Sequence, residues 1–405
     1  MLKIRNFLVI IHLLIVFSFS NQIPTILVSF DGMRYDYLEK TSTPNFDTLI
    51  KSGVKAESLI PIFPSLTFPN HYTIATGTYA GRHHITGNQY FSKIFGEQYS
   101  MYNRKTVEDP KFYKGEPIWV TAEKQGVKTA SYFWVGSEAA INGIHPSIYK
   151  KYDGKVPFET RVDSVISWLL LPKEIRPKLL MLYFSEPDKS GHIYGPDSKE
   201  VINAIKQSDL MLGRLITGLK TNKIIANVVV VSDHGMRKIS KDRVIILDDY
   251  LPSISQLIVY GEGPLMQLDS PTIDISKYLN NIPNLSVYRK EEIPQRYNFS
   301  NQNTGDYLVV ADPGWLLFTE ELFNKTTMLN IHGMHGWDPL DKKMHGFFIA
   351  NGPSIKKNTT INSFENIYIN GLISKLIGIT PYSSEFYDDG AIINPEIINS
   401  ILLSK

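Results

Sequence analysis

Cysteine is absent from the 405-residue sequence. The chain therefore forms no disulfide, and cysteine nucleophiles and thiolate metal sites are excluded. Secreted proteins often depend on disulfides, but a chain of this length can bury a core large enough to fold without them.

An excess of basic residues is also missing. Lysine and arginine number 42, against 40 aspartates and glutamates. Two of the basic residues, Lys3 and Arg5, precede an N-terminal apolar run, and without them the charges balance. A neutral chain is not expected to follow a nucleic-acid backbone, so any phosphate that it handles must be held locally, in a site.

Long hydrophobic runs are scarce, and the most apolar one lies at residues 7–19. It is shorter than the ~20 residues that a membrane-spanning helix needs. With basic residues before it and Ser18 and Ser20 at its end, it predicts a secretory signal peptide over residues 1–20. An uncleaved signal anchor is the alternative. After cleavage we expect no membrane span and a secreted or lumenal chain, extracellular in the first instance.

Four Asn-x-Ser/Thr sequons agree with export. They lie in the last third of the chain, which indicates exposed surface there: Asn284, Asn298, Asn324 and Asn358. Sequons also arise by chance, so none of them alone establishes a glycan.

Four short apolar runs lack the polar alternation of a half-exposed strand: residues 25–30, 179–184, 228–231 and 346–350. Such runs are typical of strands buried on both faces of a mainly parallel sheet. Amphipathic stretches at 158–171 and 198–219 lie between them, so the pattern predicts an α/β fold with helices flanking the sheet. We expect residues 21–405 to form a single catalytic domain, with an irregular insertion or looser lobe at about 250–330.

Acidic and histidine side chains follow three of these runs, in chain order Asp31, Asp188 with His192, and Asp233 with His234. A further histidine, His335, lies before the fourth run. Because ligands bind beyond the carboxyl ends of strands in open α/β sheets, we expect the first three sets to meet at one edge.

Carboxylates that share a small region need compensating positive charge. No run of lysine or arginine flanks these motifs, so a metal ion is the natural counter-charge. Carboxylate oxygen and imidazole nitrogen together suit zinc, and manganese or cobalt is also possible. The number of candidate ligands is too high for one tetrahedral ion and favours two ions. Taken singly each motif has an ordinary explanation, since Asp31 with Gly32 could be a turn and Asp188 with His192 a local pair. Their joint occurrence favours a metal site.

The stretch FPSLTFPNHYTIATG at residues 63–77 predicts a loop that runs into a helix. Thr67 is then either an N-terminal cap or a nucleophile. A helix N-terminus favours phosphate oxygens, and a metal ion can activate a threonine hydroxyl. Beside a two-metal site, we predict that Thr67 is the nucleophile of an in-line phosphoryl transfer.

Five motifs occur in one order along the chain: FDGMR at 30–34, TFPNHYTIATG at 67–77, EPDKSGH at 186–192, SDHGM at 232–236 and GMHG at 333–336. With them the chain resembles the ectonucleotide pyrophosphatase/phosphodiesterase family, within the alkaline phosphatase superfamily. The resemblance extends from residue 26 to about residue 381. It implies an alkaline phosphatase-like fold with a two-metal site at the carboxyl ends of the strands.

The resemblance also implies two Zn²⁺ ions per chain. The first ion would be held by Asp188, His192 and His335, and the second by Asp31, Asp233, His234 and Thr67. Asn88 and the amide of Phe68 would stabilise a phosphoryl oxygen in the transition state. Thr67 would attack phosphorus to give a covalent phosphothreonine, which water hydrolyses, so that ATP gives AMP and pyrophosphate.

The same resemblance implies a nucleotide pocket with aromatic walls. Phe68 and Tyr152 match residues that clasp the nucleobase, and further pocket positions are Trp134, Glu138 and Tyr183. Stacking on aromatic rings tolerates every base, so we expect broad nucleotide use. Glu138 stands where nucleotide-specific relatives have an aspartate, which leaves the base preference open. Core packing is the alternative role for Tyr152 and Trp134.

Other functions stay open. The nearest is a phosphodiesterase for lysophospholipid or glycerophosphocholine, because an aromatic pocket also binds choline by cation–π contact. A phosphomonoesterase would usually use serine, and a sulfatase would need a modifiable cysteine or serine in another motif. The remote alternative is a non-catalytic secreted glycoprotein, although none of the seven ligand positions is lost. We expect a monomer whose partners are nucleotide-like phosphodiesters.

Overall fold

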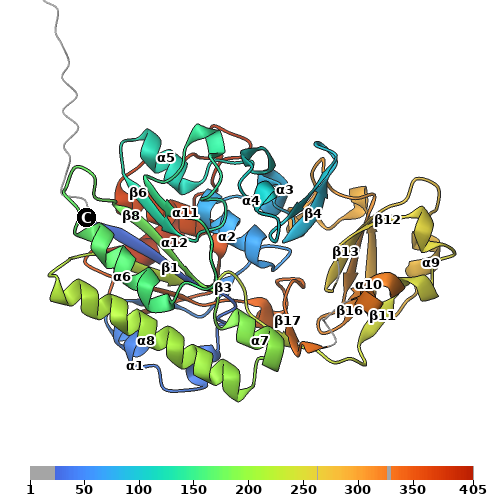
Figure 1. Cartoon of the computed structure of the whole chain (residues 1–405), viewed down its shortest axis with the longest axis horizontal. Coiled ribbons are helices and arrows are strands. Elements are labelled where there is room, and N and C mark those ends of the chain that lie inside the picture. Colours follow the sequence, from blue (N-terminus) through green and yellow to red (C-terminus); the bar gives the residue numbers. More distant parts are fainter. Residues whose placement is uncertain (1–22, 262, 326–329, 405) are drawn as a thin grey trace, which may run out of the picture.

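The computed structural model describes residues 23–261, 263–325 and 330–404. The predicted signal peptide and its signal-anchor alternative lie outside these residues. Within the described ranges, no helix is both long and apolar enough to cross a membrane. Figure 1 shows a larger α/β body with a smaller lobe beside it.

An eight-stranded sheet forms the centre of the body. Its strands lie in the order β19-β2-β18-β9-β1-β8-β6-β7. Their bounds are β1 (Thr25–Phe30), β2 (Val54–Ala56), β6 (Thr129–Tyr132), β7 (Ile148–Lys150), β8 (Leu179–Phe184), β9 (Asn227–Val231), β18 (Phe348–Asn351) and β19 (Thr359–Ile361). β1 pairs in parallel with β8 and β9, and β6 continues the parallel order. The predicted mainly parallel sheet is confirmed.

Strand β18 runs against its neighbours and pairs antiparallel with both β9 and β2. Its first residue, Phe348, pairs with Val231, the last residue of β9. The chain therefore enters β18 at the edge where β9 ends. As a result, the segment before β18, which contains His335, reaches the same edge as the residues that follow β1, β8 and β9.

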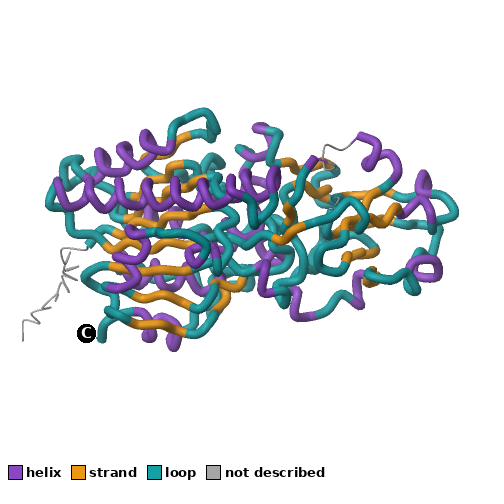
Figure 2. Tube along the Cα trace, turned by 90° about the horizontal axis from the view of Figure 1, so that it is seen from below, coloured by secondary structure: helices purple, strands orange, loops and turns teal. Residues whose placement is uncertain are grey.

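Helices cover both faces of the sheet (Figures 1 and 2). One face carries α1 (Pro44–Lys51), α6 (Phe158–Leu169) and α8 (Lys199–Thr221), and the other carries α2 (Thr67–Thr76), α5 (Ile118–Lys124), α11 (Ile369–Ile377) and α12 (Pro395–Ile401). Each face has its own hydrophobic cluster, and β1 contributes Val28 and Phe30 to one and Leu27 to the other. Burial on both faces explains why this strand has a continuous apolar sequence.

Shorter elements connect these layers. The helices among them are α3 (Ala80–His83), α4 (Arg104–Val107) and α7 (Asp188–Tyr194). The strands form three pairs: β4 (Gln89–Ser92) with β5 (Glu97–Ser100), β3 (Leu59–Ile60) with β20 (Phe364–Glu365), and β10 (Arg237–Lys238) with β17 (Gly333–Met334). Strand β17 directly precedes His335 and so helps to place it.

The lobe contains the segment at about 250–330, for which the sequence predicts irregular structure. It folds into an antiparallel sheet with the order β12-β13-β15-β14 and a parallel pair, β11-β16. The elements are β11 (Val244–Ile246), β12 (Ile258–Tyr260), β13 (Leu265–Asp269), β14 (Leu285–Arg289), β15 (Tyr307–Ala311), β16 (Leu316–Phe318), α9 (Ser276–Leu279) and α10 (Glu320–Lys325). A separate hydrophobic cluster, which includes Met266, Leu268 and Val309, stabilises the lobe. The lobe is thus more regular than expected, and the single-domain assignment stays a prediction.

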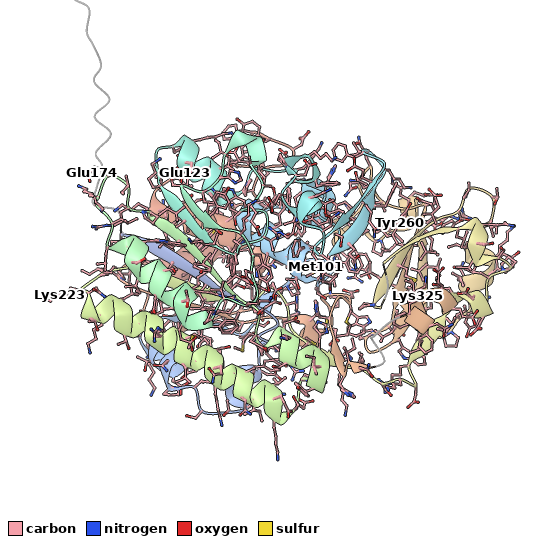
Figure 3. All side chains as sticks on the ribbon, in the orientation of Figure 1. Met101, Glu123, Glu174, Lys223, Tyr260 and Lys325 are labelled. Carbon is pink, nitrogen blue, oxygen red and sulfur yellow. The ribbon has the colours of Figure 1, made fainter. Side chains whose placement is uncertain are left out.

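Aromatic contacts join the lobe to the body. Phe63 stacks on Tyr297 with ring centroids 3.9 Å apart, and Phe91 of β4 stacks on Tyr260 of β12 at 5.2 Å. Figure 3 places Tyr260 on the side of the lobe that faces the body. Such stacked pairs favour one arrangement of the two parts.

Helix α1 is capped by a residue of another helix. Its own N-cap residue, Thr43, makes no side-chain capping bond. Instead Asp209 of α8 accepts hydrogen bonds from the backbone N–H groups of Asn45 and Phe46, each at 3.0 Å. This buried carboxylate satisfies two N–H groups that the helix itself cannot pair, and it joins α1 to α8.

We predict that Asp209→Ala lowers the free energy of unfolding by about 2 kcal/mol, because two N–H groups of the first turn, one of them buried, lose their acceptor. Asp163→Ala is the control: Asp163 forms an exposed ion pair with Arg214, and such pairs contribute little to stability. Urea denaturation of both variants beside the wild type measures the difference. Equal losses in the two variants would contradict the capping role.

Candidate metal centre and nucleophile

Three carboxylates meet at the carboxyl edge of the sheet. Asp31 follows β1, Asp188 begins α7 after β8, and Asp233 follows β9. Because β8, β1 and β9 are parallel neighbours, their ends deliver these side chains to one place. The loops also bond to one another: the Gly32 N–H donates to Oδ1 of Asp233 at 3.1 Å, and the Asp188 N–H donates to the Asp31 carbonyl at 3.0 Å.

The first group of candidate ligands contains Asp188, His192 and His335. Oδ1 of Asp188 lies 3.4 Å from Nε2 of His192 and 3.5 Å from Nε2 of His335. The two Nε2 atoms lie 3.1 Å apart. The three ligand atoms are therefore close enough to share one ion.

The second group contains Asp31, Asp233 and His234. Nε2 of His234 lies 3.0 Å from Oδ2 of Asp233 and 3.4 Å from Oδ1 of Asp31. Asp188 is also within reach of Asp31 and His234, so the two groups adjoin. Two adjacent groups of this kind are what a two-ion site requires.

The histidines of both groups present a lone pair to the centre. Each Nδ1 lies 2.8–2.9 Å from a backbone carbonyl oxygen, which belongs to Gly333 for His192, Ser65 for His335 and Gly235 for His234. A carbonyl oxygen only accepts hydrogen bonds, so each Nδ1 carries a hydrogen, and each ring in its neutral form has its lone pair on Nε2. His192 and His335 thus direct two lone pairs at each other, an arrangement that a cation between them stabilises.

Three buried carboxylate oxygens favour the same conclusion. Oδ1 of Asp31, Oδ1 of Asp188 and Oδ2 of Asp233 have no hydrogen-bond partner in the described part of the chain. A buried charge without a partner is costly, and carboxylate oxygen with imidazole nitrogen is a donor set that suits zinc. These residues therefore fit a metal centre.

The pKa values of these side chains show how unbalanced the charges are. Burial, together with the neighbouring Asp233 and Asp188, raises the pKa of Asp31 well above its ordinary value. Burial also acts to raise the pKa of Asp233, but the positive charge that the adjacent His234 and His71 rings carry when protonated outweighs it and holds that pKa well below its ordinary value. Against the effect of burial, the same pairing with Asp233 raises the pKa of His234. Burial and two neighbouring imidazoles hold the pKa of His335 well below its ordinary value, so its ring stays neutral and able to ligate.

Thr67 does not cap a helix. It is the first residue of α2, Leu66 takes the cap position, and no side chain makes a capping bond there. The Thr67 hydroxyl lies 3.2 Å from Nε2 of His234, beside the second ligand group. The next residue, Phe68, donates its backbone N–H to Oδ1 of Asn88 at 2.9 Å. The two groups predicted to hold a phosphoryl oxygen therefore lie together at the start of α2.

Asn70 explains where this helix begins. Its Oδ1 accepts from the N–H of Ile62 at 2.8 Å, and its Nδ2 donates to the carbonyl oxygens of Pro64 at 3.0 Å and Leu66 at 2.8 Å. These bonds fold the incoming loop back onto the first turn. They place Thr67 at the end of α2 that faces the ligand groups.

A family model described as type I phosphodiesterase/nucleotide pyrophosphatase matches residues 25–338. The chain belongs to this family. The matched residues contain both ligand groups and Thr67. The membership that the five motifs predict is confirmed.

Curated relatives resemble the chain over most of its length. It is 37% identical over 377 residues to human ectonucleotide pyrophosphatase/phosphodiesterase family member 1. This match covers 88% of this chain and 40% of the human protein. It is 36% identical over 376 residues to venom phosphodiesterase CdcPDE of Crotalus durissus collilineatus, and this match covers 89% of this chain and 45% of the venom protein. The chain thus spans less than half the length of these curated relatives.

Solved structures of the family share its fold. Murine ectonucleotide pyrophosphatase/phosphodiesterase 5 matches with a TM-score of 0.83 and 34% identity, over 88% of this chain and 95% of the mouse chain. An inactive threonine-to-alanine variant of the mouse protein, in complex with AMP, matches with the same TM-score and identity over 89% and 96%. The predicted alkaline phosphatase-like α/β fold is confirmed.

Two of the residues that the family resemblance assigns to a nucleotide pocket have accessible rings. Phe68 is half-buried, and Tyr152 is 43% exposed. Tyr183 packs edge to face with Tyr152 at 6.3 Å, and its hydroxyl donates to Oδ2 of Asp31 at 2.5 Å. Tyr183 therefore orients a candidate ligand carboxylate and also packs against the ring of Tyr152.

Trp134 and Glu138 lie deeper in this family member. Trp134 is 1% exposed, and its Nε1 donates to the backbone carbonyl of His71 at 3.1 Å. Glu138 is 7% exposed and forms an ion pair with Arg104. Neither side chain presents much surface, so direct substrate contact by these two residues stays a prediction.

A cavity of about 320 Å³ opens on the first ligand group, between the body and the lobe. His192, His335 and Asn88 line its body side, and Tyr260 and Gln267 line its lobe side. A phosphodiester substrate of the family needs room beyond its reacting phosphorus, and this cavity lies next to the predicted ligands. Sequence reasoning missed the lobe residues, because no motif marks them.

His71 was also missed, although it lies within one of the five motifs. It is one helical turn after Thr67 on α2, and its ring reaches both Asp31 and Asp233. The spacing of four residues from Thr67 was the available signal, since such residues share a helix face.

We predict that Gly32→Ala displaces Asp188 and weakens ion binding. Gly32 has φ +64°, and a Cβ there would lie 2.8 Å from the Cα of Asp188. Gly96→Ala is the matched control, since Gly96 has φ +63° with open space around it.

Melting temperatures with and without a chelator measure the effect. An ion that binds only the folded chain stabilises it. The chelator should therefore lower the melting temperature of the wild type and of Gly96→Ala, but that of Gly32→Ala far less. The same decrease in all three proteins would contradict the prediction.

Proposed function

We propose that this chain is a zinc-dependent nucleotide pyrophosphatase/phosphodiesterase with Thr67 as its nucleophile. The observation that carries the proposal is the position of the Thr67 hydroxyl, 3.2 Å from Nε2 of His234 at the start of α2. The family and the names of the relatives support the reaction class. The inactive threonine variant of the mouse relative, in complex with AMP, supports both the threonine and the nucleotide.

Two zinc ions would be held by the two ligand groups. Asp188, His192 and His335 would hold one. Asp31, Asp233, His234 and Thr67 would hold the other. When bound, the ions supply positive charge that balances the carboxylates and lowers the pKa of a hydroxyl or water beside them. The unpartnered carboxylate oxygens and the facing Nε2 atoms support this assignment.

In the first step, Oγ of Thr67 attacks the phosphorus and forms a new O–P bond. The bond to the leaving-group oxygen breaks on the opposite side, and this group departs with the electron pair, as pyrophosphate when the substrate is ATP. The hydroxyl proton passes to solvent. The positive end of the helix dipole at the start of α2 favours the phosphoryl oxygens. Oδ1 of Asn88 is held by the Phe68 N–H, so Nδ2 of Asn88 is left to donate to one of these oxygens.

In the second step, water attacks the phosphorus of the phosphothreonine from the side that the leaving group has left. The P–O bond to Thr67 breaks, the threonine oxygen takes a proton, and the nucleoside monophosphate is released. The cavity beside His192 and His335 gives the leaving group a way out and water a way in.

We propose that Phe68 and Tyr152 hold the nucleobase between their rings. Both have accessible ring surface, and Tyr183 packs behind Tyr152. Stacking without base-specific hydrogen bonds predicts broad nucleotide use. Trp134 and Glu138 would shape the pocket from positions of low exposure.

We also propose that the chain is exported as a monomeric glycoprotein. The backbone at Asn284, Asn298 and Asn358 has positive φ, at 63°, 45° and 48°, which asparagine tolerates in turns. Asn298 and Asn358 are exposed, and Asn324 lies near the end of α10 and is exposed as well. Glycans would be accommodated at these positions without disturbing a core.

We predict that the purified protein releases AMP and pyrophosphate from ATP and cleaves para-nitrophenyl-TMP, and that a chelator abolishes both activities. Thr67→Ala should lower kcat by about 10⁴-fold or more, as loss of the nucleophile does in other hydrolases. Thr67→Ser is the matched control, because it keeps a hydroxyl and should keep measurable activity. Product chromatography and release of para-nitrophenol measure these outcomes.

Two further substrates separate the alternatives. Cleavage of glycerophosphocholine alone would keep the role of Thr67 and overturn the nucleotide assignment. Preference for para-nitrophenyl phosphate over the diester would indicate a monoesterase. Bound metal without cleavage of any substrate would favour a non-catalytic binding glycoprotein, and full activity in Thr67→Ala would contradict the nucleophile.

A further inference from the structure

His71 is fully buried and contacts three parts of the site. Its Nδ1 lies 3.0 Å from the backbone carbonyl oxygen of Thr67 and 3.3 Å from Oδ2 of Asp233. Its Nε2 lies 2.8 Å from Oγ of Ser29, on β1. One ring therefore touches the nucleophile helix, the central strand and the loop after β9.

The ring of His71 is turned the opposite way from the ligand histidines. Its Nδ1 must carry a hydrogen, because the carbonyl oxygen of Thr67 only accepts. In the ligand histidines the atom nearest the centre is Nε2 with a lone pair, whereas in His71 it is this N–H. His71 thus cannot ligate an ion through Nδ1, but the positive end of its N–H faces a ligand carboxylate.

We propose that His71 is a positioning residue, which fixes the carboxylate of Asp233 relative to the first turn of the Thr67 helix. The proposal rests on the metal-dependent site of the proposed function. Oδ1 of Asp233 accepts from the Gly32 N–H at 3.1 Å. Nδ1 of His71 lies 3.3 Å from the other oxygen, Oδ2, without a hydrogen bond between them. The hydrogen bond from Gly32 and the positive end of the nearby His71 N–H together favour one rotation of the carboxylate, and Oδ2 keeps its lone pairs for an ion.

The surroundings of His71 hold its ring in this orientation. Trp134 and Tyr183 both pack edge to face on the ring, each with centroids 5.2 Å away. The indole N–H of Trp134 donates to the backbone carbonyl of His71 at 3.1 Å. Rotation of the ring would break the contact with Ser29 and disturb both aromatic contacts. The buried Trp134 therefore acts on the site through His71.

The test compares two variants of His71 with a control. His71→Ala removes the donor, and His71→Asn keeps an N–H close to the position of Nδ1. His83→Ala removes another fully buried histidine, which hydrogen-bonds to Thr73 of the same helix at 2.9 Å but belongs to no ligand group. Competition with a chromophoric chelator measures zinc affinity at each site, and the melting temperature of the metal-free proteins is recorded separately.

We expect His71→Ala to bind one of two zinc ions about 10- to 100-fold more weakly and the other as the wild type does. His71→Asn should recover most of the lost affinity. His83→Ala should lower the melting temperature of the metal-free protein without changing either affinity. If His71→Ala does not fold, His71→Gln takes its place in the experiment. The N–H of the glutamine lies nearer to the position of Nε2 than to that of Nδ1, so the zinc affinity of this variant should stay low.

Three results would overturn the proposal. Wild-type affinity at both sites in His71→Ala would show that the ring does not position Asp233. If His71→Ala and His83→Ala both lowered the zinc affinity of both sites equally, the cause would be general destabilisation and not the position of Asp233. A wild-type chain that binds no zinc would overturn the proposed function itself, an outcome that is distinct from the other two.

Discussion

Repulsion among three closely spaced carboxylates, two of them buried, is the constraint on which the rest of the site depends. Asp31, Asp188 and Asp233 come together where three parallel strands end, and each has an oxygen without a hydrogen-bond donor among the described residues. The groups that face these oxygens most closely are imidazole nitrogens that carry lone pairs. Bound cations would convert this repulsion into an attraction that holds the three loops together. Ion binding and local stability should therefore be coupled.

Two features of the fold bring the remaining groups to the same place. The antiparallel direction of β18 returns the chain so that His335 arrives at the edge where β9 ends. The bonds made by Asn70 fold the preceding loop so that Thr67 begins α2 beside the ligands. Residues of α2 and β18 share one hydrophobic cluster with the central sheet, so Thr67 and the candidate ligands are held by one rigid frame. Such a frame suits the proposed in-line transfer.

The predictable part of the site is the part that buried strands position. Asp31 and Asp233 could be placed from the sequence because each follows a strand whose burial on both faces leaves a continuous apolar run. The antiparallel direction of β18 could not be predicted, because an apolar run does not show whether its strand lies parallel or antiparallel to its neighbours. Strand β14 of the lobe is only partly buried, so its sequence lacks a continuous apolar run and this part of the segment looks irregular. The burial of Trp134 and the orientation of His71 depend on packing between elements far apart in the sequence, which no local pattern records.

Anomalous X-ray scattering from crystals grown with zinc, measured above and below the zinc edge, tests the central claim most directly. We expect two peaks per chain, one in contact with Asp188, His192 and His335 and the other in contact with Asp31, Asp233 and His234. The unpartnered carboxylate oxygens should point at these peaks. Peaks elsewhere only, or none, with the three carboxylates bonded to protein donors, would contradict the account.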